Sequence, residues 1–188
     1  MRRAAIALVG LLAGAAFAQD NAATYSALLA TAIEQGRAGK MTEAVATFER
    51  ALAAAADDDQ RAQALLLLAT AYRNADDEVA ALTALERALA LQEPTPWVVR
   101  CLQELTTLAG RRDRPELVRQ AAERTVALLG PEAPEAAGAV IELAQAERRA
   151  GNLEAAIARL QTLLTVGEIT AAHVQAREML VQSLCAGG

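Results

Sequence analysis

The chain has 188 residues, of which 54% are hydrophobic but only 3% aromatic, and its formal net charge is −5. This length is in the range of a single domain, and the shortage of rings excludes a core built on aromatic packing in favour of a helical stack closed by small residues. The acidic balance excludes an electrostatic attraction to nucleic acid or to an anionic bilayer.

The first 18 residues have the pattern of a secretory signal peptide. Residues 2–3 are basic, residues 4–15 are mostly apolar and uncharged, and a small-x-small cleavage pattern ends at Ala18. The apolar run is shorter than the roughly 20 residues that span a bilayer. We therefore expect cleavage after Ala18 and export to the periplasm or, alternatively, out of the cell. The mature chain then keeps 16 basic and 23 acidic residues, a net charge of −7.

A repeated segment organises the rest of the chain. Residues 49–52, Glu-Arg-Ala-Leu, recur 37 residues later as residues 86–89 and, in degraded form, after another 37 as residues 123–126. A fourth segment, residues 159–164, keeps the hydrophobic register with a slip of one residue. Self-similarity at a fixed period is typical of solenoids built from helix–turn–helix units.

Each unit contains two stripes of apolar residues at helical spacing, joined by a short turn. Gly39 in the first unit and Gly151 in the fourth suit the left-handed conformation that ends a helix, and Asn152 can cap the helix that follows. Pro115 stands near the start of the second helix of the third unit, where proline is accepted. The stripes of the second unit are Leu65, Leu68, Ala69 and Tyr72, followed by Ala81, Leu85 and Ala88.

Two acidic clusters, residues 57–59 and 76–78, admit two interpretations. A calcium loop needs alternating oxygen ligands around a glycine within about 12 residues, and neither cluster has that pattern. Both clusters precede predicted helices, where carboxylates cap backbone amides and complement the helix dipole. We therefore predict a helix N-terminus at each cluster, and a further one where Thr95 caps a helix that begins with Pro96.

The segments at residues 68–72 and 150–156 resemble the tetratricopeptide repeat (TPR) family. In that family Leu, a small residue and Tyr lie on the first helix, Gly marks the turn, and Ala, an aromatic residue and Ala lie on the second. The period of this chain is 37–38 residues rather than about 34. The tyrosine is present only in the second unit, and Gln35, Ala109 and Glu147 replace it in the others.

The resemblance implies an all-α fold, a right-handed α–α solenoid of about four TPR-like helical hairpins followed by a C-terminal capping helix. A solenoid needs such a cap to cover its last exposed face. Thr170 can cap this helix, and continued spacing puts Leu180, Val181 and Leu184 where a fifth hairpin would pack. The expected ranges are 1–18 for the signal peptide, 19–168 for the solenoid (repeats at about 25–58, 62–95, 99–132 and 137–168) and 169–188 for the capping helix and tail.

The two cysteines, Cys101 and Cys185, lie in different layers of the predicted stack. Packed helical layers are roughly 10 Å apart, and a disulfide requires its Cα atoms within about 7 Å of each other. We expect no bond between the two thiols. Cys185, close to the C-terminus, is the better candidate for reaction or for a link between chains.

The sequence contains no assembled set of catalytic residues. The single histidine, His173, is expected on a solvated face of the last helix, and neither Ser26 nor Ser183 has a base beside it in the pattern. There is no glycine-rich phosphate loop and no Cys/His spacing of a metal site. We therefore expect no enzymatic activity, no metal and no cofactor.

The resemblance also implies a concave groove, lined by first-helix positions that face away from the second helix, where extended or helical peptides bind. Each unit ends this set with arginine, whose guanidinium group suits a carboxylate ligand. Cations in the last turn of a helix also stabilise its C-terminal carbonyls, and this alone accounts for their placement. The predicted groove residues are Leu29, Ile33, Arg37, Leu66, Thr70, Arg73, Asn74, Arg100, Gln103, Arg111, Ile141, Gln145, Arg148 and Arg149.

These features favour a non-catalytic scaffold of the bacterial envelope that binds a protein or peptide segment in its groove. A lining of Leu, Ile and Arg suits an apolar anchor flanked by acidic side chains. No nucleic acid is expected as partner, and no membrane after the signal peptide is removed. The alternative is a structural subunit of an envelope assembly or a self-associating solenoid, which apolar convex positions and Cys185 favour.

Overall fold

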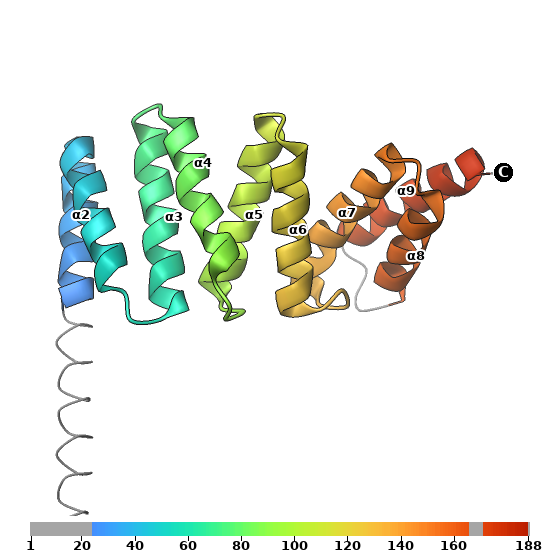
Figure 1. Cartoon of the computed structure of the whole chain (residues 1–188), viewed down its shortest axis with the longest axis horizontal. Coiled ribbons are helices and arrows are strands. Elements are labelled where there is room, and N and C mark those ends of the chain that lie inside the picture. The colour runs from blue at the N-terminus through green and yellow to red at the C-terminus, as the bar shows by residue number, and fades with distance from the viewer. Residues whose placement is uncertain (1–23, 166–170, 188) are drawn as a thin grey trace, which may run out of the picture. The chain divides into compact units, whose positions relative to one another are not determined.

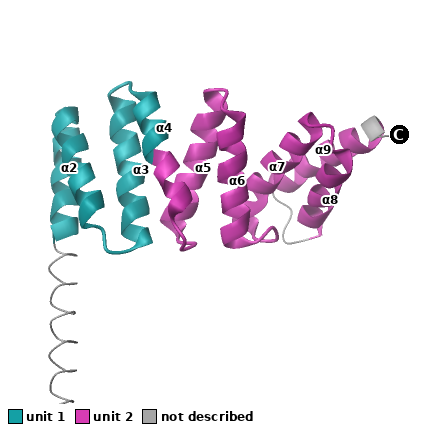
Figure 2. Ribbon diagram, in the orientation of Figure 1, with its two compact units in different colours: residues 1–84 teal, residues 85–188 magenta. Residues whose placement is uncertain are grey.

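The computed structural model describes residues 24–165 and 171–187, and every regular element within these ranges is helical (Figure 1). The expected all-α class is therefore confirmed. The predicted signal peptide, residues 1–18, and the predicted cap Thr170 lie outside the described residues. The chain divides into two compact units, of which unit 1 ends at Ala84 and unit 2 begins at Leu85 (Figure 2).

Unit 1 begins with a helix over residues 24–37, followed by α2 (Met41–Ala54), α3 (Asp58–Asn74) and the first part of α4 (Glu78–Glu86). α2 packs against α3. The buried face of α2 repeats at helical spacing, because residues three and four apart lie on the same side of a helix. It consists of Ala44, Thr47, Phe48 and Ala51.

Tyr25 ties the first helix of unit 1 to α3. Its ring is buried against alanines that include one from α3, and its hydroxyl oxygen lies 2.8 Å from the carbonyl oxygen of Gln60 and 2.9 Å from Gln63 Oε1. Burial, followed by the negative charges of Asp57 and Asp59, raises the pKa of Tyr25 to about 12. The folded state therefore favours the neutral phenol.

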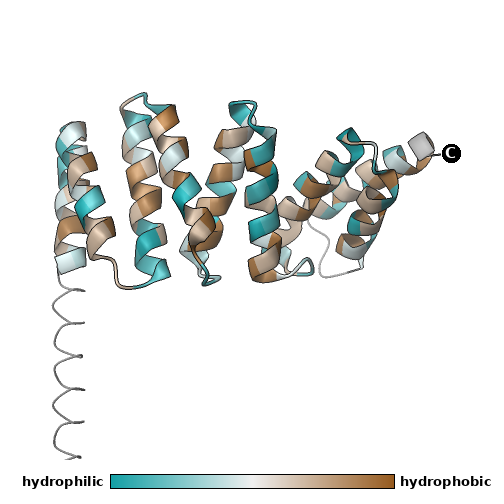
Figure 3. Ribbon diagram, viewed as in Figure 1, coloured by the Kyte–Doolittle hydropathy of each residue, from teal (hydrophilic) through white to brown (hydrophobic). Residues whose placement is uncertain are grey.

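After the rest of α4, unit 2 contains η1 (Arg87–Ala90), α5 (Pro96–Arg111), α6 (Pro115–Leu129), η2 (Pro134–Ala136), α7 (Ala137–Arg149), α8 (Leu153–Leu164) and α9 (Ala171–Gly187). Each helix from α5 to α8 packs against the next one along the chain, and α9 contacts both α8 and α7. Hydrophobic and hydrophilic residues share each of these helices (Figure 3), as amphipathic packing requires.

Small residues let the helices of unit 2 approach one another closely. Ala144 of α7 and Ala156 of α8 are fully buried in one cluster, together with Leu160 and Leu163 of α8 and Met179 of α9. A leucine buried in this way contributes about 1.5–3 kcal/mol of transfer free energy. The predicted pairing of alanine stripes with leucine is thus the packing scheme of this cluster.

The predicted helix starts are confirmed at three places. Asp57 accepts a hydrogen bond from the Gln60 amide at 2.8 Å, and Asp77 accepts one from the amide at residue 80 at 2.9 Å. Thr95 accepts from the amide at residue 98 at 3.4 Å, with Pro96 in the first turn of α5. Satisfying these amides is the role of an N-cap, so both acidic clusters have a structural explanation.

One predicted cap is wrong. Asn152 precedes α8, but among the described contacts its side chain accepts no hydrogen bond from the first turn. Its backbone amide instead donates to the carbonyl oxygen of Glu147 at 2.9 Å, which closes the end of α7. Its ψ of 63° also differs from the extended value typical of a capping side chain.

The turns inside the hairpins use a left-handed residue, as predicted for Gly39 (φ 75°) and Gly151 (φ 81°). Asp76 (φ 58°) and Asp113 (φ 52°) adopt the same conformation in the other two hairpins. Aspartate tolerates this region better than most residues with a Cβ, but less well than glycine. The sequence pattern identified the glycines and overlooked Asp113.

Copies of the repeated segment adopt different local structures. Residues 49–52 lie within α2 and residues 123–126 within α6, whereas residues 86–89 leave α4 and continue into the 3₁₀ helix η1. The chain then turns extended at Leu91, whose carbonyl oxygen accepts a hydrogen bond from the Arg124 guanidinium. Tertiary contacts of this kind override helix propensity, which is a weak determinant.

Candidate functional site

In the first helix of unit 1 the predicted groove residues differ in accessibility. Leu29 and Ile33 are half-buried, and Leu29 packs against the cluster around Tyr25. Arg37 is exposed and forms an ion pair with Glu34 at 2.8 Å. Because both side chains are largely in solvent, this pair contributes little to stability and leaves the guanidinium accessible to a ligand.

On α3 the predicted set includes one core residue. Leu66 is only 8% exposed and therefore serves packing rather than binding. Thr70 is exposed, and its hydroxyl donates to the carbonyl oxygen of Leu66 at 2.8 Å within the helix. Arg73 and Asn74 are exposed at the end of α3.

On α5, Arg100 and Gln103 are exposed and line a cleft of about 620 Å³. The prolines before and at the start of α5 form another part of its wall, and Glu104 and Glu135 also line it. Arg111 is exposed in the last turn of α5, and it is not part of this cleft.

The strongest gathering of predicted residues is at the C-terminal end of α7. Gln145, Arg148 and Arg149 line one cleft of about 550 Å³ together with residues of α8 and α9, which we call the α7–α9 cleft. Ile141, in contrast, is 3% exposed and belongs to the core cluster of α7, α8 and α9. The other residues that line the α7–α9 cleft are Leu153, Gln175, Glu178, Met179 and Gln182.

The α7–α9 cleft combines apolar surface with amide and guanidinium groups. Arg148 reaches across to α9, where it donates to Gln182 Oε1 at 3.3 Å. Gln145 Nε2 lies 3.8 Å from the sulfur of Met179, also on α9. Glu178 contributes the one acidic side chain among the residues that line this cleft. The cleft can therefore accept an apolar group and offer donors to a carboxylate beside it.

Gln145 and Arg149 also line a second cleft, of about 950 Å³, on the other side of α7 toward α5 and α6. Its charges are balanced, because its lining includes three basic and three acidic residues: Arg114, Arg119, Arg149, Asp113, Glu116 and Glu142. Sequence reasoning did not find this cleft, since its walls come from the α5–α6 turn and the start of α6 rather than from first-helix positions alone. Its balanced charge makes it less selective for an anionic ligand than the α7–α9 cleft.

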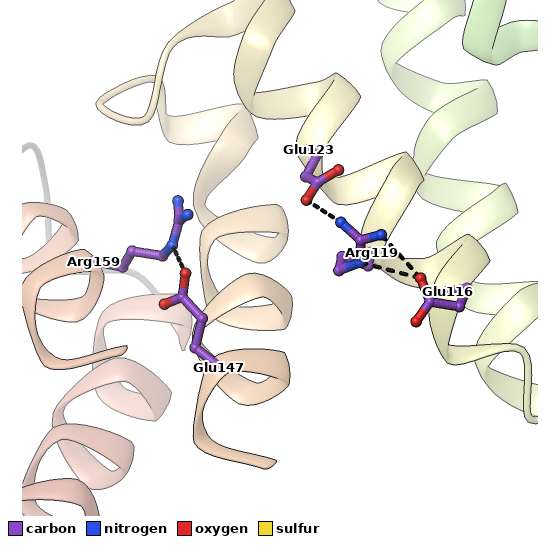
Figure 4. A network of polar contacts seen from close by, with 5 residues as sticks. All are labelled: Glu116, Arg119, Glu123, Glu147 and Arg159. Atoms are coloured by element: carbon purple, nitrogen blue, oxygen red, sulfur yellow. Dashed lines mark hydrogen bonds and ion pairs between the residues drawn. The ribbon is translucent and has the colours of Figure 1, made fainter. Parts of the chain in front are cut away.

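The ion pairs around these clefts show which arginines are already engaged (Figure 4). Arg119 pairs with Glu116 at 2.9 Å and with Glu123 at 2.6 Å, and these hydrogen bonds raise the pKa of Arg119 above its ordinary value. On the other side of α7, Arg159 of α8 pairs with Glu147 at 2.7 Å. Glu147 occupies the position of the family's tyrosine and closes the α7–α8 hairpin with a charge pair instead of a ring.

The groove arginines occupy helix ends, as both interpretations of them require. Arg73 lies in the last turn of α3, Arg111 in that of α5, and Arg148 and Arg149 in that of α7. This placement favours the C-terminal carbonyls by about 0.3–1 kcal/mol for each cation. The hydrogen bond from Arg148 to α9, however, directs that side chain into the α7–α9 cleft.

The structure corrects the expectation for the histidine. His173 is 6% exposed and packs inside α9's buried face, so it is not on a solvated surface. It precedes Ala176 and Met179 at helical spacing, and both are also buried. The sequence could not indicate this, because α9 carries apolar residues on two faces.

Other sources of chemistry are sparse in the described chain. Residues 24–165 and 171–187 contain no group of three His, Cys, Asp or Glu side chains that could hold a metal ion. Cys101 is buried in α5, Cys185 is exposed on α9, and neither is in a disulfide there. In the same ranges, no helix combines the length and apolar character needed to cross a membrane.

Helical hairpins in series, closed by small residues and bordered by shallow clefts, define the TPR-like class of fold. No protein-family model matches the sequence, and no curated protein sequence is significantly similar to it. Solved structures nevertheless share the fold. MamA matches with a TM-score of 0.54 and 17% identity, over 84% of each chain.

Two further structures support the same class. A kinesin-light-chain-like protein from Podosopora anserina with nearly identical TPR-like repeats matches with a TM-score of 0.52 and 20% identity, over 87% of this chain and 86% of that one. A tetratricopeptide repeat protein from Parabacteroides merdae matches with a TM-score of 0.60 and 15% identity, over 87% of this chain and 61% of that one. At these identities the similarity shows the fold alone.

Proposed function

We propose that this protein is a non-catalytic scaffold of the tetratricopeptide repeat family, and that it binds a protein or peptide segment in the α7–α9 cleft. The observation that carries this proposal is the meeting of three predicted groove residues, Gln145, Arg148 and Arg149, with the apolar side chains of Leu153 and Met179. The TPR-like fold supports it, because proteins of this class present helix faces to other proteins.

The chemistry of the cleft suggests the kind of ligand. Leu153 and Met179 suit an apolar anchor, and methionine adapts its shape to different side chains. Arg148 and Arg149 suit acidic residues beside that anchor, since guanidinium groups bind carboxylates through paired hydrogen bonds. Glu178 lies in the same cleft and disfavours a ligand with uniform negative charge. We therefore propose a peptide with one apolar anchor and a few flanking acidic residues.

Export to the bacterial envelope is part of the proposal. It rests on the signal-peptide pattern of residues 1–18, with a basic start, a short apolar run and a small-x-small cleavage pattern. N-terminal sequencing of the protein recovered from the periplasmic fraction tests it. A first residue of Gln19 is the expected result, and an uncleaved cytoplasmic protein contradicts it.

The binding proposal is tested by selecting random phage-displayed peptides on the immobilised protein and measuring the affinity of the selected sequences. Selected peptides should carry an apolar residue flanked by Asp or Glu. The double variant Arg148→Gln/Arg149→Gln should lose about tenfold or more in affinity, and the salt dependence of binding should weaken with it.

Arg50→Gln is the matched control, because Arg50 is an exposed arginine on α2 outside the predicted groove. This variant should bind the selected peptides as the unmodified protein does. Selected peptides without acidic residues, or equal losses in the control and the double variant, contradict the proposed ligand chemistry. Peptides that bind at α5 or α3 instead would contradict the proposed cleft.

A further inference from the structure

The α7–α9 cleft shares part of its lining with the cleft of about 950 Å³, which we call the α5–α7 cleft. Gln145 and Arg149 line both of them. These two residues stand four positions apart, so they lie on one side of α7. The two clefts therefore meet along this side of α7, and one ligand can contact both.

The polar residues of α7 that line the α5–α7 cleft form an ordered stripe. Glu142, Gln145 and Arg149 follow one another at intervals of three and four residues, so they share a face of the helix. Along α7 this stripe reads acid, amide, base. A helix rises 1.5 Å per residue, which puts Glu142 and Arg149 about 10 Å apart along the axis.

Glu142 and Arg149 are both available to a ligand. Neither side chain forms an ion pair with another residue of the described chain. Arg149 is exposed, whereas Glu142 is half-buried. An opposite charge bound at Glu142 is therefore screened less by salt than one bound to a fully exposed carboxylate.

The other charged residues that line the α5–α7 cleft offset one another. Glu116 and Arg119 form an ion pair at 2.9 Å. Asp113 and Arg114 are neighbours in the chain with opposite charges, so their combined field is weak at a distance. Glu142 is therefore the position in this cleft that best suits a basic side chain.

We propose that the peptide segment bound in the α7–α9 cleft continues into the α5–α7 cleft as an extended chain, and that it carries a lysine or arginine that pairs with Glu142. This inference rests on the proposed peptide binding and adds a second point of recognition to it. An extended chain advances about 3.3 Å per residue, so the stripe from Arg149 to Glu142 spans about three ligand residues. The basic residue then stands three positions from the acidic residue that pairs with Arg149.

Gln145 lies between the two charges and suits an extended backbone. Its side-chain amide offers a donor and an acceptor, and its Nε2 makes a long contact of 3.8 Å to the sulfur of Met179, a weak acceptor. An extended ligand keeps its own N–H and C=O groups free for such an amide, whereas a helix uses them internally. A helical ligand needs about seven residues between its acidic and basic positions to match the same stripe.

The first experiment selects random phage-displayed peptides of about 12 residues, long enough to reach both clefts when extended, on the immobilised protein as purified from cells. The selected sequences should carry Lys or Arg three positions from the Asp or Glu that flanks the apolar anchor. Selected peptides without such a basic residue contradict the inference. A spacing of about seven residues contradicts the extended conformation and indicates a helical ligand.

Glu142→Gln should weaken binding of a selected synthetic peptide about fivefold or more, measured by isothermal titration calorimetry. The loss should be several-fold smaller for a peptide in which Gln replaces the basic residue, because the pair is then already broken. Glu154→Gln is the matched control, since Glu154 is exposed on α8 and is not among the residues that line either cleft. Equal losses for the two protein variants overturn the inference.

A charge exchange tests direct pairing and shows at the same time that the variant is folded. Glu142→Lys should weaken the selected peptide more than Glu142→Gln does, because it places like charges together. It should recover affinity for a peptide in which Glu replaces the basic residue. Absence of this recovery contradicts a contact between the ligand's basic residue and position 142.

Arg148→Gln separates this inference from the proposed function, because Arg148 lines the α7–α9 cleft and is not among the residues that line the α5–α7 cleft. Losses with both Arg148→Gln and Glu142→Gln support a ligand that spans the two clefts. A loss with Arg148→Gln alone means that the peptide stays in the α7–α9 cleft, which overturns the inference and leaves the proposed function intact. No loss with either variant contradicts both.

Discussion

α7 and α9 are helices of the same unit, yet their surroundings differ. α7 packs against α6, α8 and α9, whereas α9 packs against α8 and α7 and leaves its opposite side exposed. As a result Ala144 of α7 is fully buried, whereas Val181 of α9 is 60% exposed. The comparison teaches that apolar character alone does not decide burial, because the neighbouring helices determine whether an apolar side chain becomes core or surface.

Leucine truncation should show the largest contrast between the two environments. Leu160 is fully buried where α8 meets α7, and Leu184 is 53% exposed on α9. Leu160→Ala should lower the free energy of unfolding by about 2–5 kcal/mol, because it removes buried methyl groups and leaves a cavity. Leu184→Ala should change it by less than about 0.5 kcal/mol. Urea denaturation of both variants measures the difference, and similar losses would contradict the exposed placement of Leu184 on α9.

The closing contact of the α7–α8 hairpin should have the next largest effect. Arg159→Ala removes the partner of Glu147 Oε1, while Glu147 Oε2 is already buried without a partner among the described residues. An unsatisfied, partly buried carboxylate should cost about 1–2 kcal/mol. The control is Arg119→Ala, whose ion pairs lie exposed along α6 and should contribute much less to stability. Equal urea midpoints for the two variants would mean that Glu147 gains no more from its partner than a surface residue does.

Alanine substitution of two glycines tests backbone geometry at the two ends of α7. Gly151 has φ of 81° in the turn to α8, so Gly151→Ala should destabilise by about 1 kcal/mol through strain alone. Gly138 lies in the first turn of α7, where a Cβ meets nothing within 4 Å, so Gly138→Ala should stabilise by about 0.5–1 kcal/mol. Opposite signs in thermal or urea unfolding are the expected result. Destabilisation by both would show that α7 does not begin at its observed first turn.

Much of the fold was predictable, because it depends on features with a local physical cause. The 37-residue period, the alanine stripes and the caps at Asp57 and Thr95 each follow from spacing or from hydrogen-bonding chemistry. The turn at Asp113 was missed since aspartate seldom adopts positive φ, and Asn152 was assigned a cap that the closing contact of α7 makes unnecessary.

The candidate site was less predictable than the fold. Leu66 and Ile141 carry the groove pattern but are buried, because a helical position at the edge of a stripe can turn either way with a small rotation of the helix. His173 was expected on a solvated face but is buried, because a small rotation of α9 likewise decides which of its sides packs against the core. The α7–α9 cleft depends on which side of α7 the last helix occupies, and no residue of α7 alone encodes that.

The first helix of unit 1 extends the comparison to a contact that is closed by a hydroxyl group rather than by apolar packing alone. Tyr25 has its pKa raised to about 12, chiefly by burial and then by Asp57 and Asp59. Below about pH 10 the phenol is neutral in both states, and its contribution to stability is fully present. As the pH rises from about 10 to 12, the unfolded chain loses the phenolic proton first, so the folded state loses stability relative to it.

Urea denaturation from pH 8 to pH 11 measures this loss. The free energy of unfolding should fall more for the unmodified protein than for Tyr25→Phe, by about 1 kcal/mol or less. Tyr72→Phe serves as control, because Tyr72 is half-buried on α3 and should not remove this slope. If Tyr25→Phe keeps the full dependence of unfolding free energy on pH, a buried phenol does not hold the first helix in place. The first helix is then not covered in the way that α7 is.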